Sequence, residues 1–224
     1  MHVVSANVLE QWSALTDEQV VAEVLRGHTA LFEVLMRRHN ERIYRAARAI
    51  TRDEREAEDV MQQAYLNAYA HLRQFDGRAK FSTWLTRIAV HEALRRVRRR
   101  PSLASLDAQN PSTLEFPMPA TTAPDPERQA FARELRGLLE LAIDALPDGS
   151  REVFMLRQVE GMSTEDVAET LDVSEDVVKT RLSRARAALR RDLAQRAGIV
   201  SPEAFRFLRP RCDRIVANVL GRIL

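Results

Sequence analysis

The sequence is poor in several residue types, and each shortage excludes a class of structure or function. Cys212 is the only cysteine among the 224 residues, so neither an intramolecular disulfide nor a cysteine-based zinc site can form. No apolar run approaches the roughly 20 residues that a transmembrane helix needs, and Met1 is not followed by the basic segment and apolar core of a secretory signal. We therefore predict a cytoplasmic protein that holds no metal and does not insert into a membrane.

Lysine is nearly absent as well, because Lys80 and Lys179 are the only two lysines beside 32 arginines. The formal net charge of +2 says little about nucleic acid by itself, but the charge is unevenly placed. Residues 81–100 carry six arginines and one glutamate, whereas residues 101–127 carry four acidic residues and no basic one. Basic segments separated by acidic ones indicate both polyanion and protein partners.

Helical periodicity dominates the sequence outside one proline-rich stretch. No segment alternates apolar and polar residues with period two for long enough to predict a strand. Residues 101–126 hold six of the nine prolines, which prevents regular structure and favours an extended chain that can hold flanking domains apart. We expect an all-α fold of two small helical domains joined by this Pro-rich linker. The expected divisions are an N-terminal arm 1–15, a first domain 16–100, the linker 101–126, a second domain 127–197 and a C-terminal amphipathic helix 198–224.

Residues 163–191 are typical of a helix-turn-helix. Ser163 is suited to cap a first helix, and a second helix starting at Ser174 carries an inward apolar stripe. That stripe consists of Val178, Leu182, Ala185 and Leu189. The residues expected on the outer side are Lys179, Thr180, Ser183 and Arg184, flanked by Arg181 and Arg186. Polar and basic residues at the start of a second helix can reach the base edges and phosphates of DNA, although a charged helix pair can also simply face water.

Residues 80–100 form a second informative stretch. At helical spacing one stripe carries an aromatic residue and several basic ones, namely Trp84, Arg87, His91, Arg95 and Arg98. This pattern is typical of single-strand binding, because stacking of a base on an aromatic ring contributes about 1–3 kcal/mol and arginines hold the backbone. The alternative is that Phe81 and Trp84 are core residues and the arginines only solvate the helix end. The residues alone leave this choice open.

Residues 57–75 predict one amphipathic helix. Its core side carries residues spaced four apart, Val60, Ala64, Ala68 and Leu72. The polar residues left outside are Asp59, Gln62 and Gln63. A polar helix face of this kind usually has no partner, so the pattern alone predicts no binding site.

The C-terminal segment 201–224 carries seven apolar residues on one helical face between Cys212 and Leu224. Burial of a large apolar side chain contributes about 1.5–3 kcal/mol, so such a face needs a cover. We predict that this helix folds back onto the second domain with Cys212 as an apolar filler. The alternative is a docking helix for a partner protein, with Cys212 exposed.

Three stretches taken together resemble one protein family. They are AEDVMQQAYLNAY at 57–69, FSTWLTRIAVHEALRRVRRR at 81–100 and LPDGSREVFMLRQVEGMSTEDVAETLDVSEDVVKTRLSRARAALR at 146–190. In this order, and with a proline-rich linker between the second and third, they resemble the extracytoplasmic-function (ECF) group of the sigma-70 family of bacterial RNA polymerase sigma factors. The resemblance covers roughly residues 16–195.

The resemblance implies a role for each stretch. Asp59, Gln62 and Gln63 are then expected to dock on the β′ clamp helices of core RNA polymerase, and the β flap is a further implied contact. The residues implied in recognition and melting of the minus-ten promoter element are Lys80, Phe81, Trp84, Arg87, His91, Arg95 and Arg98. Those implied in reading the minus-thirty-five element as duplex are Lys179, Thr180, Arg181, Ser183, Arg184 and Arg186. The implied partners are core RNA polymerase, promoter DNA both as duplex and as single strand, and possible regulation by an anti-sigma factor.

Two other classes of function are compatible with parts of the sequence. A conventional repressor or activator could use the same helix-turn-helix as a symmetric dimer, but residues 81–100 would then have no role. An enzyme acting on nucleic acid would need clustered carboxylates, a metal site or an activated nucleophile. The acidic residues at 53–59 have no histidine or glycine loop near them in sequence. We therefore predict a factor without catalytic residues or cofactor.

Overall fold

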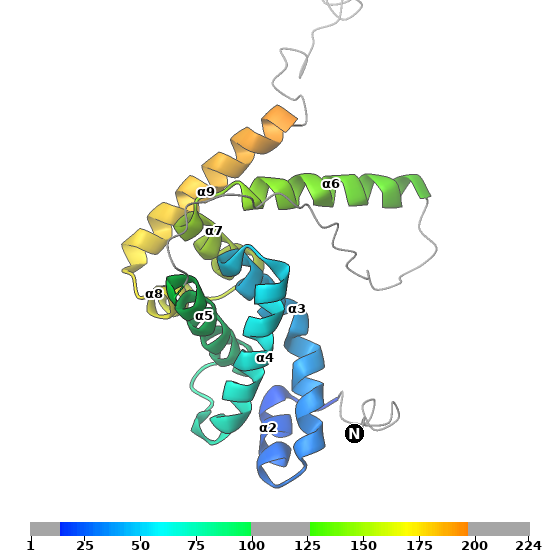
Figure 1. The fold of residues 1–224 in the computed structure, drawn as a ribbon, viewed down its shortest axis with the longest axis vertical. Helices are drawn as coiled ribbons and strands as arrows, with labels where there is room; N and C mark the ends of the chain where they lie inside the picture. The colour runs from blue at the N-terminus through cyan, green and yellow to red at the C-terminus, as the bar shows by residue number, and fades with distance from the viewer. Residues whose placement is uncertain (1–13, 100–125, 197–224) are drawn as a thin grey trace, which may run out of the picture.

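A computed structural model describes residues 14–99 and 126–196, and every regular element in these two ranges is helical (Figure 1). The first range contains α2 (Asp17–Leu25), α3 (Phe32–Thr51), α4 (Glu54–Ala70) and α5 (Phe81–Arg99), with short 3-10 turns at Thr29–Leu31 and Leu72–Gln74. The second contains α6 (Pro126–Asp144), α7 (Asp148–Phe154) with a π-helical continuation at Met155–Val159, α8 (Thr164–Leu171) and α9 (Glu175–Arg196). The predicted all-α fold is confirmed. The linker and the C-terminal helix predicted above lie outside the described residues.

Side-chain caps fix where several helices begin. Thr16 and Gln19 form a reciprocal capping box at the start of α2. Asp53 accepts a hydrogen bond from the backbone N–H of Glu56 and so starts α4 at Glu54. The prediction of one helix over 57–75 is therefore wrong at both ends, because α4 begins three residues earlier and gives way to the 3-10 turn after Ala70.

The first core lies among α2, α3, α4 and α5. Its centre is formed by buried side chains that include Val20, Leu35, Ile43, Leu72, Phe81 and Leu85. The four-residue spacing predicted for α4 holds, because Val60, Ala64 and Ala68 are all buried. This core fixes α5 against α3 and α4, and it leaves the outer sides of α4 and α5 to carry polar residues.

The second domain packs against the first, and one apolar cluster contains residues of both. Ala46, Ala47 and Ile50 of α3 and Val90 of α5 meet side chains from beyond the linker, which include Val153, Leu156, Val167 and Leu171. In Figure 1, α7 lies next to α3 and α8 lies next to α5. The expectation that the linker can hold the domains apart therefore does not describe this conformation, in which they touch over α3 and α5.

A smaller cluster joins α6 to α9. It consists of Ala142, Leu146, Ala185 and Leu189, with Ile143 and Leu193 packed against it. Towards its N-terminus α6 extends away from the body of the molecule (Figure 1), and Leu135, Leu139 and Leu141 are exposed along it.

Candidate nucleic-acid and protein interfaces

The helix-turn-helix is built by α8, a tight turn and α9. Ser163 caps α8: its Oγ accepts from the Asp166 N–H at 2.9 Å, and the Asp166 side chain bonds back to Ser163. The turn passes through Asp172, whose φ of 54° lies in the left-handed region. Glycine is common at such positions because it has no Cβ, and aspartate is one of the few other residues that adopts this conformation readily. The aspartate at this turn is therefore compatible with a helix-turn-helix.

The two sides of α9 differ in the way that the sequence predicts. Val178, Ala185 and Leu189 are buried, and Leu182 is partly buried. The predicted outer residues Lys179, Thr180, Ser183 and Arg184 are all exposed. This exposed side therefore presents two basic and two hydroxyl-bearing side chains that a ligand can reach.

Arg181 and Arg186 lie differently from the four outer residues. Arg181 is half-buried against α7, where a Cβ added at Gly149 would lie 2.8 Å from the Arg181 Cζ. Arg186 is exposed, and its Nη2 donates to the Gln158 Oε1 at 2.5 Å. Both arginines thus contact α7 or its π-helical continuation, and they border the outer side of α9 instead of lying at its centre.

The start of α5 corrects one predicted site residue. Phe81 is 1% exposed and packs its ring against Phe75, Trp84 and His39. It belongs to the core, which removes it from the surface that DNA can reach. Trp84 is half-buried, with ring centroids 5.6 Å from those of Phe75 and of Phe81. The core alternative thus holds for Phe81, whereas part of the Trp84 ring remains accessible.

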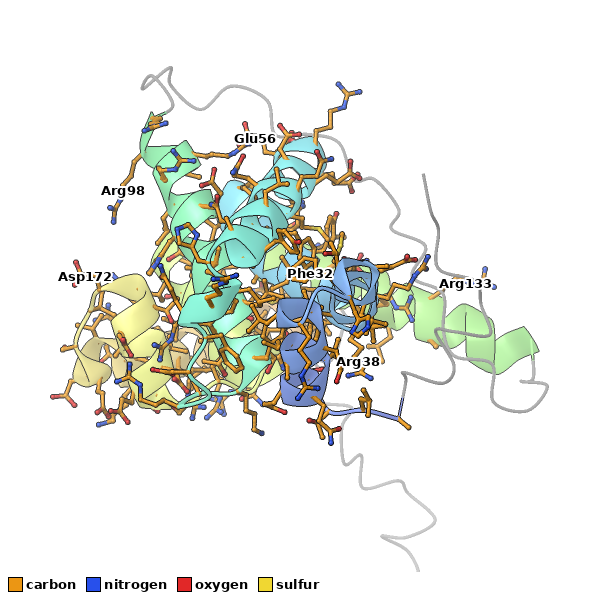
Figure 2. All side chains as sticks on the ribbon, turned by 90° about the horizontal axis from the view of Figure 1, so that it is seen from below. Phe32, Arg38, Glu56, Arg98, Arg133 and Asp172 are labelled. Carbon is orange, nitrogen blue, oxygen red and sulfur yellow. The ribbon has the colours of Figure 1, made fainter. Side chains whose placement is uncertain are left out.

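The basic stripe of α5 continues beyond Trp84. His91, Arg95 and Arg98 are exposed and line a groove of about 410 Å³ whose other wall includes Thr170, Leu171 and Asp172 of the helix-turn-helix. Figure 2 shows Arg98 and Asp172, from the two walls, on the same side of the molecule. Lys80 is exposed just before α5, and its carbonyl accepts from the Trp84 N–H. The structure therefore brings these predicted residues together along one helix.

Arg87 differs from the rest of this stripe. Its Nη2 lies 2.6 Å from the Asp166 Oδ1 and 2.8 Å from the Glu169 Oε2, both on α8. Burial raises the pKa of Asp166, but hydrogen bonds from Ser163 and Arg87 outweigh this and hold the pKa below its ordinary value. The Asp166 carboxylate that faces Arg87 is therefore charged near neutral pH.

The outer face of α4 carries the third predicted site. Asp59 and Gln62 are exposed, and Gln63 is half-exposed and donates to the Asn67 Oδ1 at 2.9 Å. Asp59 pairs with Arg96 of α5, with 3.1 Å between Oδ2 and Nη1.

Leu66 extends this face, and the sequence reasoning missed it. At 65% exposure it is the most exposed large apolar residue among the described ones, and it lies one helical turn beyond Gln62 and Gln63. The sequence pattern could have identified Leu66, because this apolar residue does not belong to the buried stripe formed by Val60, Ala64 and Ala68. The exposed leucine gives this otherwise polar face one apolar point that a partner could cover.

These features together define a helix-turn-helix protein with an additional helical domain that carries a basic helix, α5, and a mainly polar outer face on α4. Residues 35–102 match the family described as Sigma-70 region 2, and residues 136–189 match Sigma-70 region 4. The chain belongs to the sigma-70 family of RNA polymerase sigma factors, in its ECF group. Members of this family recognise promoters together with RNA polymerase, so the chain is a transcription initiation factor.

Several characterised relatives resemble the chain over most of its length. The RNA polymerase sigma-H factor of Pseudomonas aeruginosa and the ECF sigma factor SigW of Bacillus subtilis are each 32% identical over 77% of the chain, covering 91% and 94% of those proteins. The ECF sigma-E factor of Escherichia coli is 32% identical over 78% of the chain and 93% of its own length.

Two solved structures resemble the chain in fold. The structure of CnrH in complex with the cytosolic domain of CnrY matches 80% of the chain and 97% of CnrH, with 27% identity and a TM-score of 0.52. Sigma factor RpoE of Bartonella quintana, solved with the anti-sigma factor NepR, matches 72% of the chain and 96% of RpoE, with 21% identity and a TM-score of 0.55. In the part of the chain that the structure describes, no helix combines the length and apolarity needed to cross a membrane.

Proposed function

We propose that three surfaces of this sigma factor divide the work of initiation. The outer side of α9 reads the minus-thirty-five element, the basic side of α5 engages the minus-ten element and its unpaired strand, and the outer face of α4 docks on core polymerase. The observation that carries the proposal is the two-sided character of α9, whose exposed basic side is backed by a buried apolar side within the region 4 match.

The geometry of α9 supports its proposed role. A recognition helix enters the major groove with residues of its N-terminal half against base edges. Lys179, Thr180, Ser183 and Arg184 occupy that half of α9 and are exposed. Arginine can bind guanine through two hydrogen bonds, whereas hydroxyl groups accept or donate to several bases. We assign base reading to Arg184 and positioning on phosphates to the arginines that border this side.

The role of α5 combines charge with one aromatic ring. Trp84 is anchored by Phe75 and Phe81 while part of its ring stays exposed, so an unpaired base can stack on it at little entropic cost. His91, Arg95 and Arg98 follow along the helix and can hold the strand backbone. Binding energy gained only with unpaired bases biases the duplex towards opening. Core polymerase supplies the catalysis.

The role of α4 rests on a compact mixed surface. Asp59, Gln62 and Gln63 can hydrogen-bond a partner, and Leu66 supplies the apolar centre that their face otherwise lacks. Since CnrH was solved in complex with the cytosolic domain of CnrY, and RpoE with the anti-sigma factor NepR, we also propose that this chain has an anti-sigma factor as a protein partner.

Transcription with purified components tests the proposal. Mixed with core polymerase and genomic fragments, the full chain should yield discrete run-off transcripts that core polymerase alone does not make. Their start sites should share two upstream elements. The rival view, a stand-alone dimeric regulator, requires instead tight duplex binding by the chain alone and no new transcripts on adding core polymerase; that pair of results would refute the proposal.

A further inference from the structure

The apolar stripe of α6 extends beyond its contact with α9. Ala142 and Leu146 of this helix are buried in the cluster that joins it to α9. Leu139 and Leu135, one and two helical turns nearer the N-terminus, are 40% and 52% exposed. Spacings of four, three and four residues place all four side chains on one side of the helix. Among the described residues, the N-terminal half of this stripe therefore has no cover.

A groove between α6 and α9 continues this uncovered surface. Its volume is about 330 Å³, and the α6 wall includes Ala142 and Ala145. The other wall lies on the C-terminal half of α9, between Ala188 and Gln195. Leu141, one turn before Ala145, adds a further exposed leucine on this side. Alanines on both walls leave room for the larger apolar side chains of a third helix.

The chain continues directly from this groove. Its described part ends at Arg196, the residue after Gln195 of the groove wall, and residues 197–224 follow. Fully extended, residues 197–211 can span about 50 Å. Helix α6 as a whole is about 28 Å long. The residues from 212 onward can therefore reach any part of α6.

Residues 212–224 have the pattern that such a groove needs. Their seven apolar residues share one helical face, while Arg211, Arg214, Asn218 and Arg222 fall on other sides. A helix of this length is marginal in water by itself. The connection to α9 keeps the segment beside α6 at a high effective concentration. A free partner or a second copy of the chain lacks that advantage.

We propose that α6 and the groove beside α9 form the binding site for the chain's own residues 212–224, which dock there as a helix. This helix covers Leu135, Leu139 and Leu141, fills the groove and completes the second domain. The packing predicted from the sequence thus has a defined site. The proposal does not depend on the surfaces assigned above to DNA and polymerase.

Hydrogen exchange of the purified full chain, read by mass spectrometry on peptides from 212–224, tests the proposal. When the segment is docked, its amides should exchange roughly tenfold more slowly, or slower still, than in an unstructured peptide of the same sequence. Light scattering at the same concentrations shows whether the chain is a monomer or self-associates.

The double variant Leu135→Gln and Leu139→Gln removes apolar surface and keeps good helix formers in α6. Because burial of one large side chain shifts an equilibrium by about tenfold or more, this variant should lose the protection of 212–224. Val216→Gln with Val219→Gln is the reciprocal change and should speed exchange in residues 132–139 of α6. Leu25→Gln is the matched control, since Leu25 is an exposed leucine at the end of α2; it should change neither rate.

Protection of 212–224 in the monomer that both double variants remove, with α8 and α9 still protected, is the expected result. If the α6 variant also unfolds α8, the Val216 and Val219 variant decides, because it changes no described residue. Unprotected exchange of 212–224 in the free chain would overturn the proposal and leave the exposed leucines to a partner protein. Protection that survives the changes on α6 would overturn it too. Protection seen only where the chain self-associates would assign this face to a second copy instead.

Discussion

Replacement of Arg184 by alanine should separate base reading from general attraction to DNA. Arg184 is exposed on α9, and no ion pair to another described residue holds it. Alanine is the best helix former, so the free energy of unfolding should change by no more than about 0.5 kcal/mol. Loss of a bidentate contact to guanine should cost about 1–3 kcal/mol of binding. At about 1.4 kcal/mol per tenfold, this predicts a loss of roughly 5- to 150-fold in affinity for a duplex that carries the minus-thirty-five element.

Arg190→Ala is the matched comparison, because Arg190 is an exposed arginine of the same helix, further from the N-terminal half. We expect it to weaken binding evenly across sequences and to reduce the salt slope by about one. Fluorescence anisotropy with native and scrambled elements, each over a salt series and in the presence of core polymerase, gives both quantities. The assignment of the two faces is wrong if Arg184→Ala loses as much affinity for the scrambled duplex as for the native one.

Four further outcomes are expected. Trp84→Ala should leave the closed promoter complex largely intact and reduce the amount of permanganate-reactive open complex. A template with a pre-melted bubble should restore transcription by this variant. If the bubble template does not restore transcription and the variant has a lowered melting temperature, Trp84 is a core residue only. Leu66→Ala should weaken binding to core polymerase by about 1–2 kcal/mol without lowering the stability of the chain. Competition against the unmodified chain for core polymerase measures this loss, and an unchanged affinity would exclude Leu66 from the proposed docking face. Asp172→Val should destabilise the chain by about 1–2 kcal/mol and Asp172→Gly should be nearly neutral in denaturant unfolding, because only the first adds a β-branched side chain at positive φ; equal effects would contradict the strain argument. Cys212 lies outside the described residues. If the C-terminal helix covers apolar surface such as the exposed leucines of α6, Cys212 should react slowly with a thiol reagent until denaturant is added. Fast labelling of the native chain would rule out this packing of the C-terminal helix.

The sequence predicted the helices and the faces of α9 because local physics determines both. The capping residues Thr16 and Ser163 are recognisable as such, and the apolar spacing of Val178, Ala185 and Leu189 matches their burial. The same logic failed for the limits of α4, because the Asp53 cap starts the helix at Glu54, ahead of the amphipathic pattern that begins at residue 57. Phe81 was misplaced because an aromatic at the edge of a basic stripe has the same pattern whether it packs inward or outward.

The contacts between the two domains could not be predicted from the sequence. Glu160 follows the π-helical turn and looks like any surface glutamate, and only the packing of that turn on α3 buries it against Arg42 and Arg45. Arg87 matched a single-strand binding stripe, yet its observed partners are far away in sequence on α8. Pairings of this kind depend on tertiary geometry, which periodicity does not encode.

Gly149 of α7 lies outside the side of α9 that we propose to face DNA, yet it affects what that helix presents. Because it has no side chain, the Arg181 guanidinium can rest against α7, and a Cβ there would come within 3.0 Å of three guanidinium atoms. Substitution by alanine would force this flexible end to move and would change the position of one cation on α9. Related chains can therefore diverge in promoter preference through a position that never meets a base, and comparisons of specificity limited to groove-facing residues would overlook it.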